Sequence, residues 1–176
     1  AAVTFGSGTA AIYFAVTNIL KQGDELIAAN NLYGGTFTQF DAILPQQGIT
    51  THFTPVNDFE AVEKAVNGKT RGIYIETIGN PSLDTADIEQ YASLARKYHL
   101  PLIIDATFTP PTLLRPIEHG ANIVIHSLSK WIGGHGCGIG GIVIDAGNFD
   151  WSDPKFALYN EPDRGYHGMR FAHDLG

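Results

Sequence analysis

The sequence predicts an α/β domain in which a mainly parallel sheet lies between layers of helices. Short apolar segments of about five residues alternate with segments of about a dozen residues whose apolar side chains recur every three or four positions. Strands separated by helices in this way indicate βαβ units, whose crossover connections produce parallel strands. Hydrophobic residues make up 44% of the 176 residues, so the chain can cover both faces of such a sheet.

Four segments carry the spacing of amphipathic helices. In residues 8–20 the apolar side chains stand at positions 11, 12, 15, 16, 19 and 20, which lie on one face of a helix. We expect the other helices over residues 36–44, where Pro45 ends the helix, over 58–66 and over 87–99.

Short apolar segments predict the strands of the sheet. They cover residues 25–29, 50–54, 71–76, 100–105, 121–126 and 141–145. The last strand follows the one before it after a short connection, so we expect it to run antiparallel to its neighbour. Residues 148–176 are rich in aromatic and turn residues, and their pattern indicates no regular element.

Charge and composition exclude several classes of function. Eleven Lys and Arg against eighteen Asp and Glu give a net charge of −7, which argues against a nucleic acid or an anionic membrane as partner. No apolar run approaches the length of a membrane span, and we recognise no secretory signal. The single cysteine, Cys137, rules out an internal disulfide framework and indicates a reducing compartment, so we expect a cytoplasmic protein.

Polar residues follow several of the expected strands at the point where each strand ends. Ligands of parallel sheets bind beyond the carboxyl ends of the strands, so these residues are candidates for a binding site. They are Tyr33-Gly34-Gly35, Glu76-Thr77-Ile78-Gly79-Asn80-Pro81, Asp105-Ala106-Thr107 and His126-Ser127-Leu128-Ser129-Lys130, together with Ser7-Gly8-Thr9 at the start of the first helix. A cofactor with a phosphate, an aromatic ring and an aldehyde requires such a set.

Lys130 and Asp105 indicate the chemistry of the site. A desolvated lysine loses its proton and becomes a nucleophile towards carbonyl groups. Taken alone, Lys130 is also explained as a surface lysine, and Asp105 as a turn cap or a metal ligand. Taken together, they match pyridoxal phosphate, which requires a lysine for the Schiff base and an aspartate beside the pyridinium nitrogen.

The phosphate of such a cofactor needs hydrogen-bond donors and a positive potential. The segment Ser7-Gly8-Thr9 offers backbone N–H groups at the positive end of a helix dipole. Ser127 and Ser129 flank the lysine and add hydroxyl donors. Without the other motifs, the first segment would be better explained as a helix cap.

Two other kinds of site fit the sequence less well. Residues 136–141 match the glycine spacing of a dinucleotide-binding fingerprint, but a strand follows them where that fingerprint requires a helix. The seven histidines are scattered without the close spacing of metal ligands, so we expect no metal site. His126 and His135 are instead expected to be packed or hydrogen-bonded beside the lysine loop.

Five motifs, in order along the chain, resemble those of the cystathionine γ-synthase-like family, the pyridoxal-phosphate enzymes of Cys/Met metabolism. They are Ser7-Gly8-Thr9-Ala10-Ala11, Tyr33-Gly34-Gly35-Thr36, Glu76-Thr77-Ile78-Gly79-Asn80-Pro81, Asp105-Ala106-Thr107-Phe108 and Ser127-Leu128-Ser129-Lys130-Trp131-Ile132-Gly133-Gly134-His135-Gly136. The resemblance covers essentially the whole chain and implies the large domain of a fold-type-I transferase, with a mainly parallel, seven-stranded type of sheet. Residues 133–141, 148–151 and 161–168 look most like the O-acetylhomoserine sulfhydrylase branch.

The resemblance implies a role for each motif. Lys130 would form the Schiff base with the cofactor, Asp105 would pair with the pyridine nitrogen and Tyr33 would stack on the ring, so these are the expected catalytic residues. Asn80 would bind the ring hydroxyl, and Thr107 would support the ring beside Asp105. The expected phosphate ligands are the backbones of Gly8 and Thr9 with Ser127 and Ser129.

Two positions depart from the family pattern. Thr9 stands where many relatives have Met, which leaves a phosphate contact through the backbone unchanged. Cys137 stands where the sulfhydrylase branch commonly has Thr, and we expect its side chain to pack in the loop without a chemical role.

The implied reaction is γ-replacement on O-acetyl-L-homoserine. Lys130 would move protons, acetate would leave Cγ, and sulfide or a thiol would take its place to give homocysteine or methionine, as in methionine biosynthesis. Methionine or cystathionine γ-lyase and cystathionine γ-synthase share every motif quoted above and remain alternatives, as does a catalytically inert fragment.

The resemblance also implies an organisation beyond this chain. Family members are much longer, so we expect residues 1–176 to be the cofactor-binding large domain, without the N-terminal arm and the C-terminal small domain. We further expect a homo-oligomer, a dimer or a homotetramer, whose active sites are shared between subunits.

Overall fold

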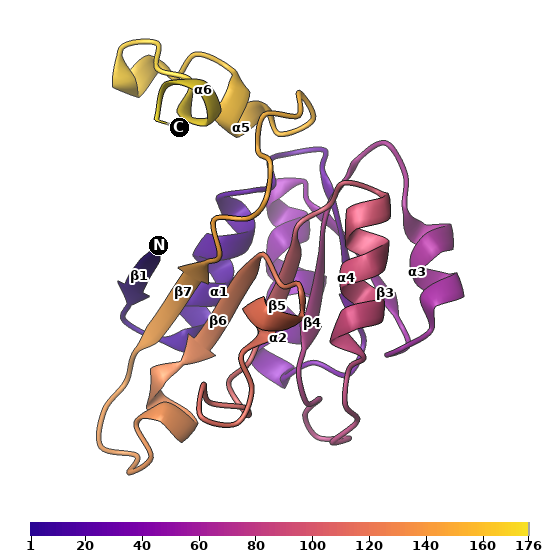
Figure 1. Cartoon of the computed structure of the whole chain (residues 1–176), viewed down its shortest axis with the longest axis vertical. Coiled ribbons are helices and arrows are strands. Elements are labelled where there is room, and N and C mark those ends of the chain that lie inside the picture. Colours follow the sequence, from indigo (N-terminus) through magenta and orange to yellow (C-terminus); the bar gives the residue numbers. More distant parts are fainter. Residues whose placement is uncertain (176) are drawn as a thin grey trace.

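A seven-stranded sheet forms the centre of the protein in the computed structural model, which describes residues 1–175. The strand order is β1-β7-β6-β5-β4-β2-β3 (Figure 1). The strands are β1 (Ala2–Phe5), β2 (Glu25–Ala29), β3 (Thr50–Thr54), β4 (Thr70–Glu76), β5 (Leu102–Asp105), β6 (Ile123–Ser127) and β7 (Gly141–Asp145). The α/β class and the strands expected from the sequence are confirmed, with small shifts of their bounds.

The direction of the strands changes at one side of the sheet. From β2 to β6 every neighbouring pair of strands is parallel, whereas β7 runs antiparallel to β6, as expected, and β1 runs antiparallel to β7. The sequence did not predict β1, because its residues are mostly exposed at the edge of the sheet and show no buried alternation.

Helices connect most of the strands. They are α1 (Gly8–Thr17), α2 (Gly34–Thr38), α3 (Phe59–Ala65), α4 (Ile88–Lys97), α5 (Ala157–Asn160) and α6 (Phe171–Asp174). The expectation that Pro45 ends the second helix was wrong. After α2 the chain continues through a π-helical turn, Gln39–Ile43, and a 3₁₀ turn, Leu44–Gln47, in which proline is tolerated at the start because its missing N–H needs no partner there.

Short polar side chains fix the starts of the three longest helices. The Oγ atom of Ser7 accepts a hydrogen bond from the backbone N–H of Ala10 at 3.0 Å, and Asp58 and Asp87 cap α3 and α4 in the same way. Each such cap contributes about 1 kcal/mol. Ser7 therefore fixes the start of α1 at the place where the sequence predicts a phosphate site.

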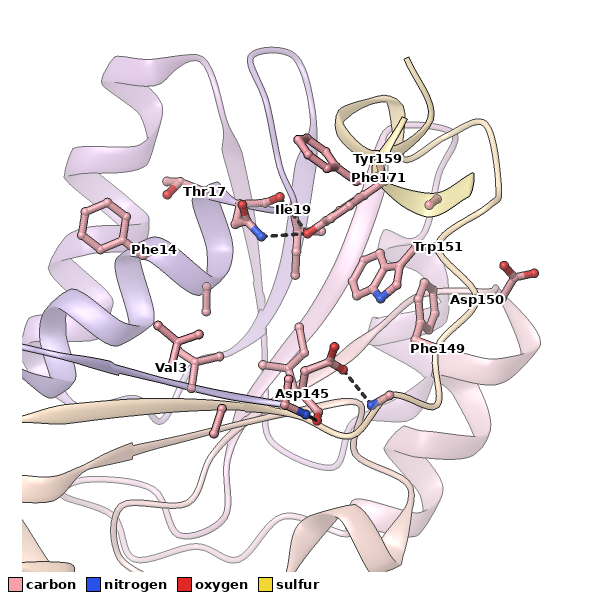
Figure 2. A pocket seen from close by; sticks show the side chains of 18 of the residues that line it. Val3, Phe14, Thr17, Ile19, Asp145, Phe149, Asp150, Trp151, Tyr159 and Phe171 are labelled. Carbon is pink, nitrogen blue, oxygen red and sulfur yellow. Dashed lines mark hydrogen bonds between the residues drawn. The ribbon is translucent and has the colours of Figure 1, made fainter. Parts of the chain in front are cut away.

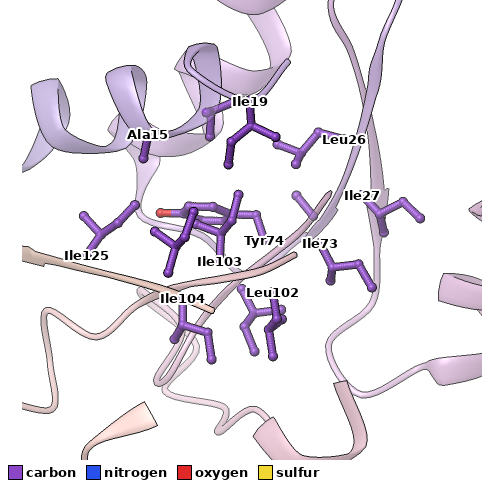
Figure 3. Close-up of a cluster of buried hydrophobic side chains, with 14 of the residues drawn as sticks. Ala15, Ile19, Leu26, Ile27, Ile73, Tyr74, Leu102, Ile103, Ile104 and Ile125 are labelled. Carbon is purple, nitrogen blue, oxygen red and sulfur yellow. The ribbon is translucent and has the colours of Figure 1, made fainter. Parts of the chain in front are cut away.

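The hydrophobic core lies on both faces of the sheet. Helix α1 packs against β6 and β7, and α4 packs against β4 and β5 (Figure 1). Because side chains alternate along a strand, Ile103 of β5 projects towards α1 and the residues just after it, while Leu102 and Ile104 project to the other face (Figure 3). These aliphatic side chains are almost fully buried, so the central strands hold their positions firmly.

The carboxyl ends of the parallel strands share one edge of the sheet. Glu76 ends β4, Asp105 ends β5 and Ser127 ends β6. The strand β1 runs in the same direction as β6, because both are antiparallel to β7, so Gly8 at the start of α1 reaches the same edge. This topology gathers residues that are far apart in the sequence.

The segment after β7 lies at the opposite end of the sheet (Figure 1). It contains α5 and α6, which the sequence did not predict because each is a single turn. Its aromatic residues pack on one another, with the rings of Phe149 and Trp151 4.6 Å apart and those of Trp151 and Phe156 5.3 Å apart. Among residues 1–175, no helix has the length and apolar character required to cross a membrane.

Candidate functional site

A cavity of about 350 Å³ opens at the carboxyl edge of the parallel strands. It is lined by Ser7, Gly8, Thr9, Ile12, Tyr33, Glu76, Asn80, Asp105, Thr107, Phe108, Ser127, Ser129, Lys130, Trp131 and Ile139. Every site residue predicted from the sequence belongs to this lining. Lys130 and Asp105 therefore face one cavity of a size that small-molecule sites commonly have.

The start of α1 forms one end of this cavity. The N–H groups of Gly8 and Thr9 lie in the first turn, where the helix itself offers them no acceptor. Gly8 is closely packed, because a Cβ atom at this position would lie 2.6 Å from the Cβ atom of Ser127. Glycine thus allows the helix start and the end of β6 to approach each other, which brings the free N–H groups beside the Ser127 hydroxyl.

Asp105 provides a buried negative group at the end of β5. Its side chain is only 7% exposed, and Oδ1 accepts hydrogen bonds from the Thr107 backbone N–H at 2.8 Å and from Thr107 Oγ1 at 2.5 Å. Burial raises the pKa of Asp105, and the two Thr107 hydrogen bonds oppose this shift by favouring the charged form. A cation placed beside the carboxylate would compensate its loss of hydration.

Thr107 connects the ends of β5 and β6. Its Oγ1 accepts a hydrogen bond from the backbone N–H of Ser127 at 2.9 Å while it donates to Asp105. A single hydroxyl therefore holds the end of β6 against the carboxylate that ends β5. Lys130 follows three residues after Ser127, so the turn that carries the lysine starts from this anchored strand end.

Lys130 lies in a tight turn after β6. The turn spans Leu128–Ile132, and Lys130 departs from helical geometry within it, with φ −102° and ψ −118°. The Ser129 hydroxyl accepts a hydrogen bond from the Gly140 N–H at 3.0 Å, which closes the loop behind the lysine. The Lys130 side chain is exposed, so the described residues do not provide the desolvation that the sequence suggested.

Tyr33 and Asn80 lie on the remaining side of the cavity. The Tyr33 backbone N–H donates a hydrogen bond to Oε1 of Glu76 at 2.8 Å. Its ring lies over Gly35, where a Cβ atom would be 2.6 Å from the ring atom Cε1. The backbone N–H of Asn80 donates to the carbonyl of Asn31 at 3.1 Å, which anchors the loop that carries the Asn80 amide.

Glu76 is a site residue whose role the sequence analysis missed. It is 4% exposed and lies directly opposite Asp105 in the pairing of β4 with β5. Burial, and in addition the charge of Asp105, raise the pKa of Glu76 to about 8. The position of Glu76 at the end of a strand could have indicated a role for it in the sequence, because Asp105 was selected for the same reason.

Cys137 and His126, for which the sequence predicted packing, differ in their exposure to solvent. Cys137 is exposed, which contradicts the expectation that it packs in the loop, because the surrounding glycines offer no side chains to cover it. His126 is 1% exposed on β6, as expected for a packed histidine, and burial lowers its pKa.

A larger cavity, of about 950 Å³, lies between β1, β7, α1 and the C-terminal segment (Figure 2). Its lining is mainly apolar and aromatic and includes Val3, Phe14, Trp151 and Phe171. None of the predicted site residues lines it. Its size therefore does not make it the better candidate for chemistry.

Comparisons with known proteins identify a family of pyridoxal-phosphate enzymes. A family model for the Cys/Met metabolism PLP-dependent enzymes matches residues 1–162. The chain is 47% identical to the O-acetyl-L-homoserine sulfhydrylase of Leptospira meyeri over 97% of its own length and 39% of that protein. The chain therefore spans well under half the length of this curated relative.

Solved structures agree with the fold. The structure of this chain matches a crystal structure described as an O-acetylhomoserine (thiol)-lyase from Campylobacter jejuni, which contains a pyridoxyl-lysine phosphate, with a TM-score of 0.94 and 32% identity over 97% of this chain and 43% of that one. It also matches the cystathionine γ-lyase of Lactobacillus plantarum with a TM-score of 0.77 and 40% identity, over 82% of this chain and 38% of that one.

The close approach at Gly8 leads to a test of stability. We expect Gly8→Ala to lower the free energy of unfolding by about 1–3 kcal/mol, because the added methyl group must push α1 away from Ser127. Denaturant unfolding measures this change. Gly68→Ala is the matched control, since a Cβ atom there meets no atom within 4 Å; equal effects of the two substitutions would contradict the packing described.

The raised pKa of Glu76 leads to a test of pH dependence. The pKa of Glu76 in the folded protein is about 8, above the ordinary 4.5. The stability that depends on a protonated Glu76 is therefore fully present below pH 4.5 and is lost as the pH rises through about 8. Relative to Glu76→Gln, we expect the cofactor-free protein to lose up to about 5 kcal/mol over this range. Urea unfolding across it measures the difference; a difference that does not change with pH would show that Glu76 ionises normally.

Proposed function

Because this chain belongs to the Cys/Met metabolism PLP-dependent enzyme family, we propose that its cavity holds pyridoxal 5′-phosphate and that the protein catalyses γ-replacement on O-acetyl-L-homoserine. Sulfide or a thiol would replace acetate, giving homocysteine or methionine. One observation carries the proposal: Lys130, Asp105, Tyr33 and the helix start at Gly8, which come from distant parts of the chain, line one cavity.

The start of α1 and the end of β6 would hold the phosphate. The first-turn N–H groups of Gly8 and Thr9 are without intrahelical acceptors and lie at the positive end of the helix dipole, which suits an anion. Ser127 adds a hydroxyl donor beside them. Ser129 also lines the cavity, but its hydroxyl already bonds to Gly140, so it would bind phosphate as a secondary ligand.

Asp105, Tyr33 and Asn80 would hold the aromatic ring of the cofactor. A protonated ring nitrogen is the cation that the buried carboxylate of Asp105 lacks, and Thr107 keeps that carboxylate in one orientation. Tyr33 offers a flat aromatic face for stacking. The Asn80 amide can donate a hydrogen bond to the oxygen substituent of the ring.

Lys130 is the residue that would move protons. When bound, pyridoxal phosphate supplies an electron-accepting ring that stabilises negative charge at Cα of an amino acid. In its unprotonated form, the Lys130 amine can accept the proton of Cα and return protons to neighbouring positions, and such proton transfers contribute roughly 10²–10⁴-fold each. Acetate then leaves Cγ and the sulfur atom of the second substrate bonds to the same carbon.

γ-Elimination on methionine or cystathionine is a second candidate. The match to a cystathionine γ-lyase favours it, and the cavity residues are compatible with both reactions. Both begin with removal of the Cα proton, so they differ only in the group that leaves and in what enters afterwards. The choice of product therefore distinguishes them.

The organisation of the whole protein is a further part of the proposal. We infer a cytoplasmic homo-oligomer, a dimer or tetramer, in which this chain forms the cofactor-binding domain and other segments bind the substrate carboxylate. Exposed apolar side chains around the cavity support a shared site, among them Trp131, which is 59% exposed, and Ile139, which is 80% exposed. The exposed thiol of Cys137 suits a reducing compartment.

Product analysis tests the proposed reaction. Incubation of the intact protein with O-acetyl-L-homoserine and sulfide is expected to release homocysteine and acetate in equal amounts. Lys130→Ala is expected to lower the rate by about 10²–10⁴-fold or more, because the proton-transferring amine is removed.

The control for this assay is Lys64→Ala, which removes an exposed lysine on α3 and leaves the cavity intact. Product formation from methionine alone would favour γ-elimination. If the protein forms product from neither substrate, or if Lys130→Ala keeps full activity, the proposal is wrong.

A further inference from the structure

Glu76 lines the cavity, but it has no role in the reaction described above. The residue is only 4% exposed, and burying a carboxyl group costs free energy unless the group is hydrogen-bonded. It makes one hydrogen bond of note, in which the backbone N–H of Tyr33 donates to Oε1 at 2.8 Å. This bond joins residues 43 positions apart in the chain.

The bond to Glu76 is well placed to control Tyr33. Tyr33 stands between β2 and α2, and the residue is 48% exposed, so packing alone holds its side chain loosely. On the other side, β4 is one of the most buried strands of the sheet, and Glu76 is its last residue. The hydrogen bond therefore attaches a loosely held aromatic residue to a rigid strand.

The surroundings of Glu76 favour the uncharged acid. Asp105 on β5 stands opposite it in the strand pairing, and Tyr74 on β4 is buried on the same face. Lys130, on the turn after β6, lines the same cavity, and the residues that α1 contributes to the lining carry no charge. Two buried carboxylates side by side repel each other, so one of them keeps its proton. Thr107 donates two hydrogen bonds to Asp105, which makes Asp105 the charged member.

We propose that Glu76 is a positioning residue: its neutral carboxyl group accepts the Tyr33 N–H bond and thereby orients the Tyr33 ring over the cofactor. The orienting effect rests on the proposed function, since it presumes that Tyr33 stacks on pyridoxal phosphate. The hydrogen bond and the neutral state do not depend on that function. The proposal therefore has one part that is tested without cofactor and one part that is tested with it.

The first measurement is amide hydrogen exchange of Tyr33 in the cofactor-free intact protein. Glu76→Ala is expected to make exchange at this amide about tenfold faster, the equivalent of one lost hydrogen bond. Glu76→Gln keeps an uncharged acceptor of the same length and is expected to preserve the protection. Glu76→Asp, which is shorter, is expected to resemble Glu76→Ala and serves if the alanine variant does not fold.

The second measurement is the circular dichroism induced in bound pyridoxal phosphate, together with its dissociation constant. Glu76→Ala and Glu76→Asp are expected to change the induced signal and weaken binding several-fold, and Glu76→Gln is expected to restore both. Glu60→Gln, which alters an exposed acid on α3, is the control for a substitution of a glutamate outside the cavity.

Each outcome decides one part of the proposal. Unchanged Tyr33 exchange in Glu76→Ala would overturn the hydrogen bond. If Glu76→Gln behaved like Glu76→Ala in the exchange measurement, the bond would require a charged carboxylate and the neutral state would be wrong. Faster exchange with an unchanged induced signal would overturn the orienting role. Failure of the unmodified protein to bind pyridoxal phosphate would instead refute the proposed function and leave the exchange result standing.

Discussion

The site depends on which of two buried carboxyl groups carries a negative charge and which keeps its proton. The two groups end neighbouring strands. Glu76 and Asp105 lie opposite each other in the pairing of β4 with β5, and both side chains are almost fully buried at the cavity. Thr107 gives Asp105 two donors that favour its charged form, while Glu76 meets a single backbone N–H. The charge thus belongs to Asp105, which calls for a cation such as a protonated ring nitrogen.

The topology of the sheet explains why the other groups meet this charge. Parallel strands bring Glu76, Asp105 and Ser127 to one edge, and the pairing of β1 with β7 carries the start of α1 to the same place. The helix start then faces the cavity with unpaired N–H groups, and the tight turn after β6 presents Lys130. The N–H groups of the helix start, a buried acid and an amine are consequently held by elements that the aliphatic core keeps rigid.

Local pattern was enough to predict much of this arrangement from the sequence. Helical spacing marked α1, α3 and α4, and apolar runs marked six of the strands, because each of these elements buries one face or both. Strand ends then identified Lys130 and Asp105 as candidates. The features that the sequence did not predict depend on residues far apart in the chain. β1 is recognisable only through its pairing with β7, and the hydrogen bond that Glu76 accepts comes from Tyr33, 43 residues away. The exposure of Lys130 and of Cys137 likewise depends on how the loop stands away from the core.

The central claim is that the amine of Lys130 meets the aldehyde of pyridoxal phosphate in the cavity beside Asp105. Borohydride reduction of the intact protein isolated with its cofactor, followed by peptide mass mapping, tests this claim most directly. The account predicts a phosphopyridoxyl group on the peptide that contains Lys130 and on no other lysine. A modified lysine elsewhere, or an unmodified Lys130 in protein that retains the cofactor, would contradict it.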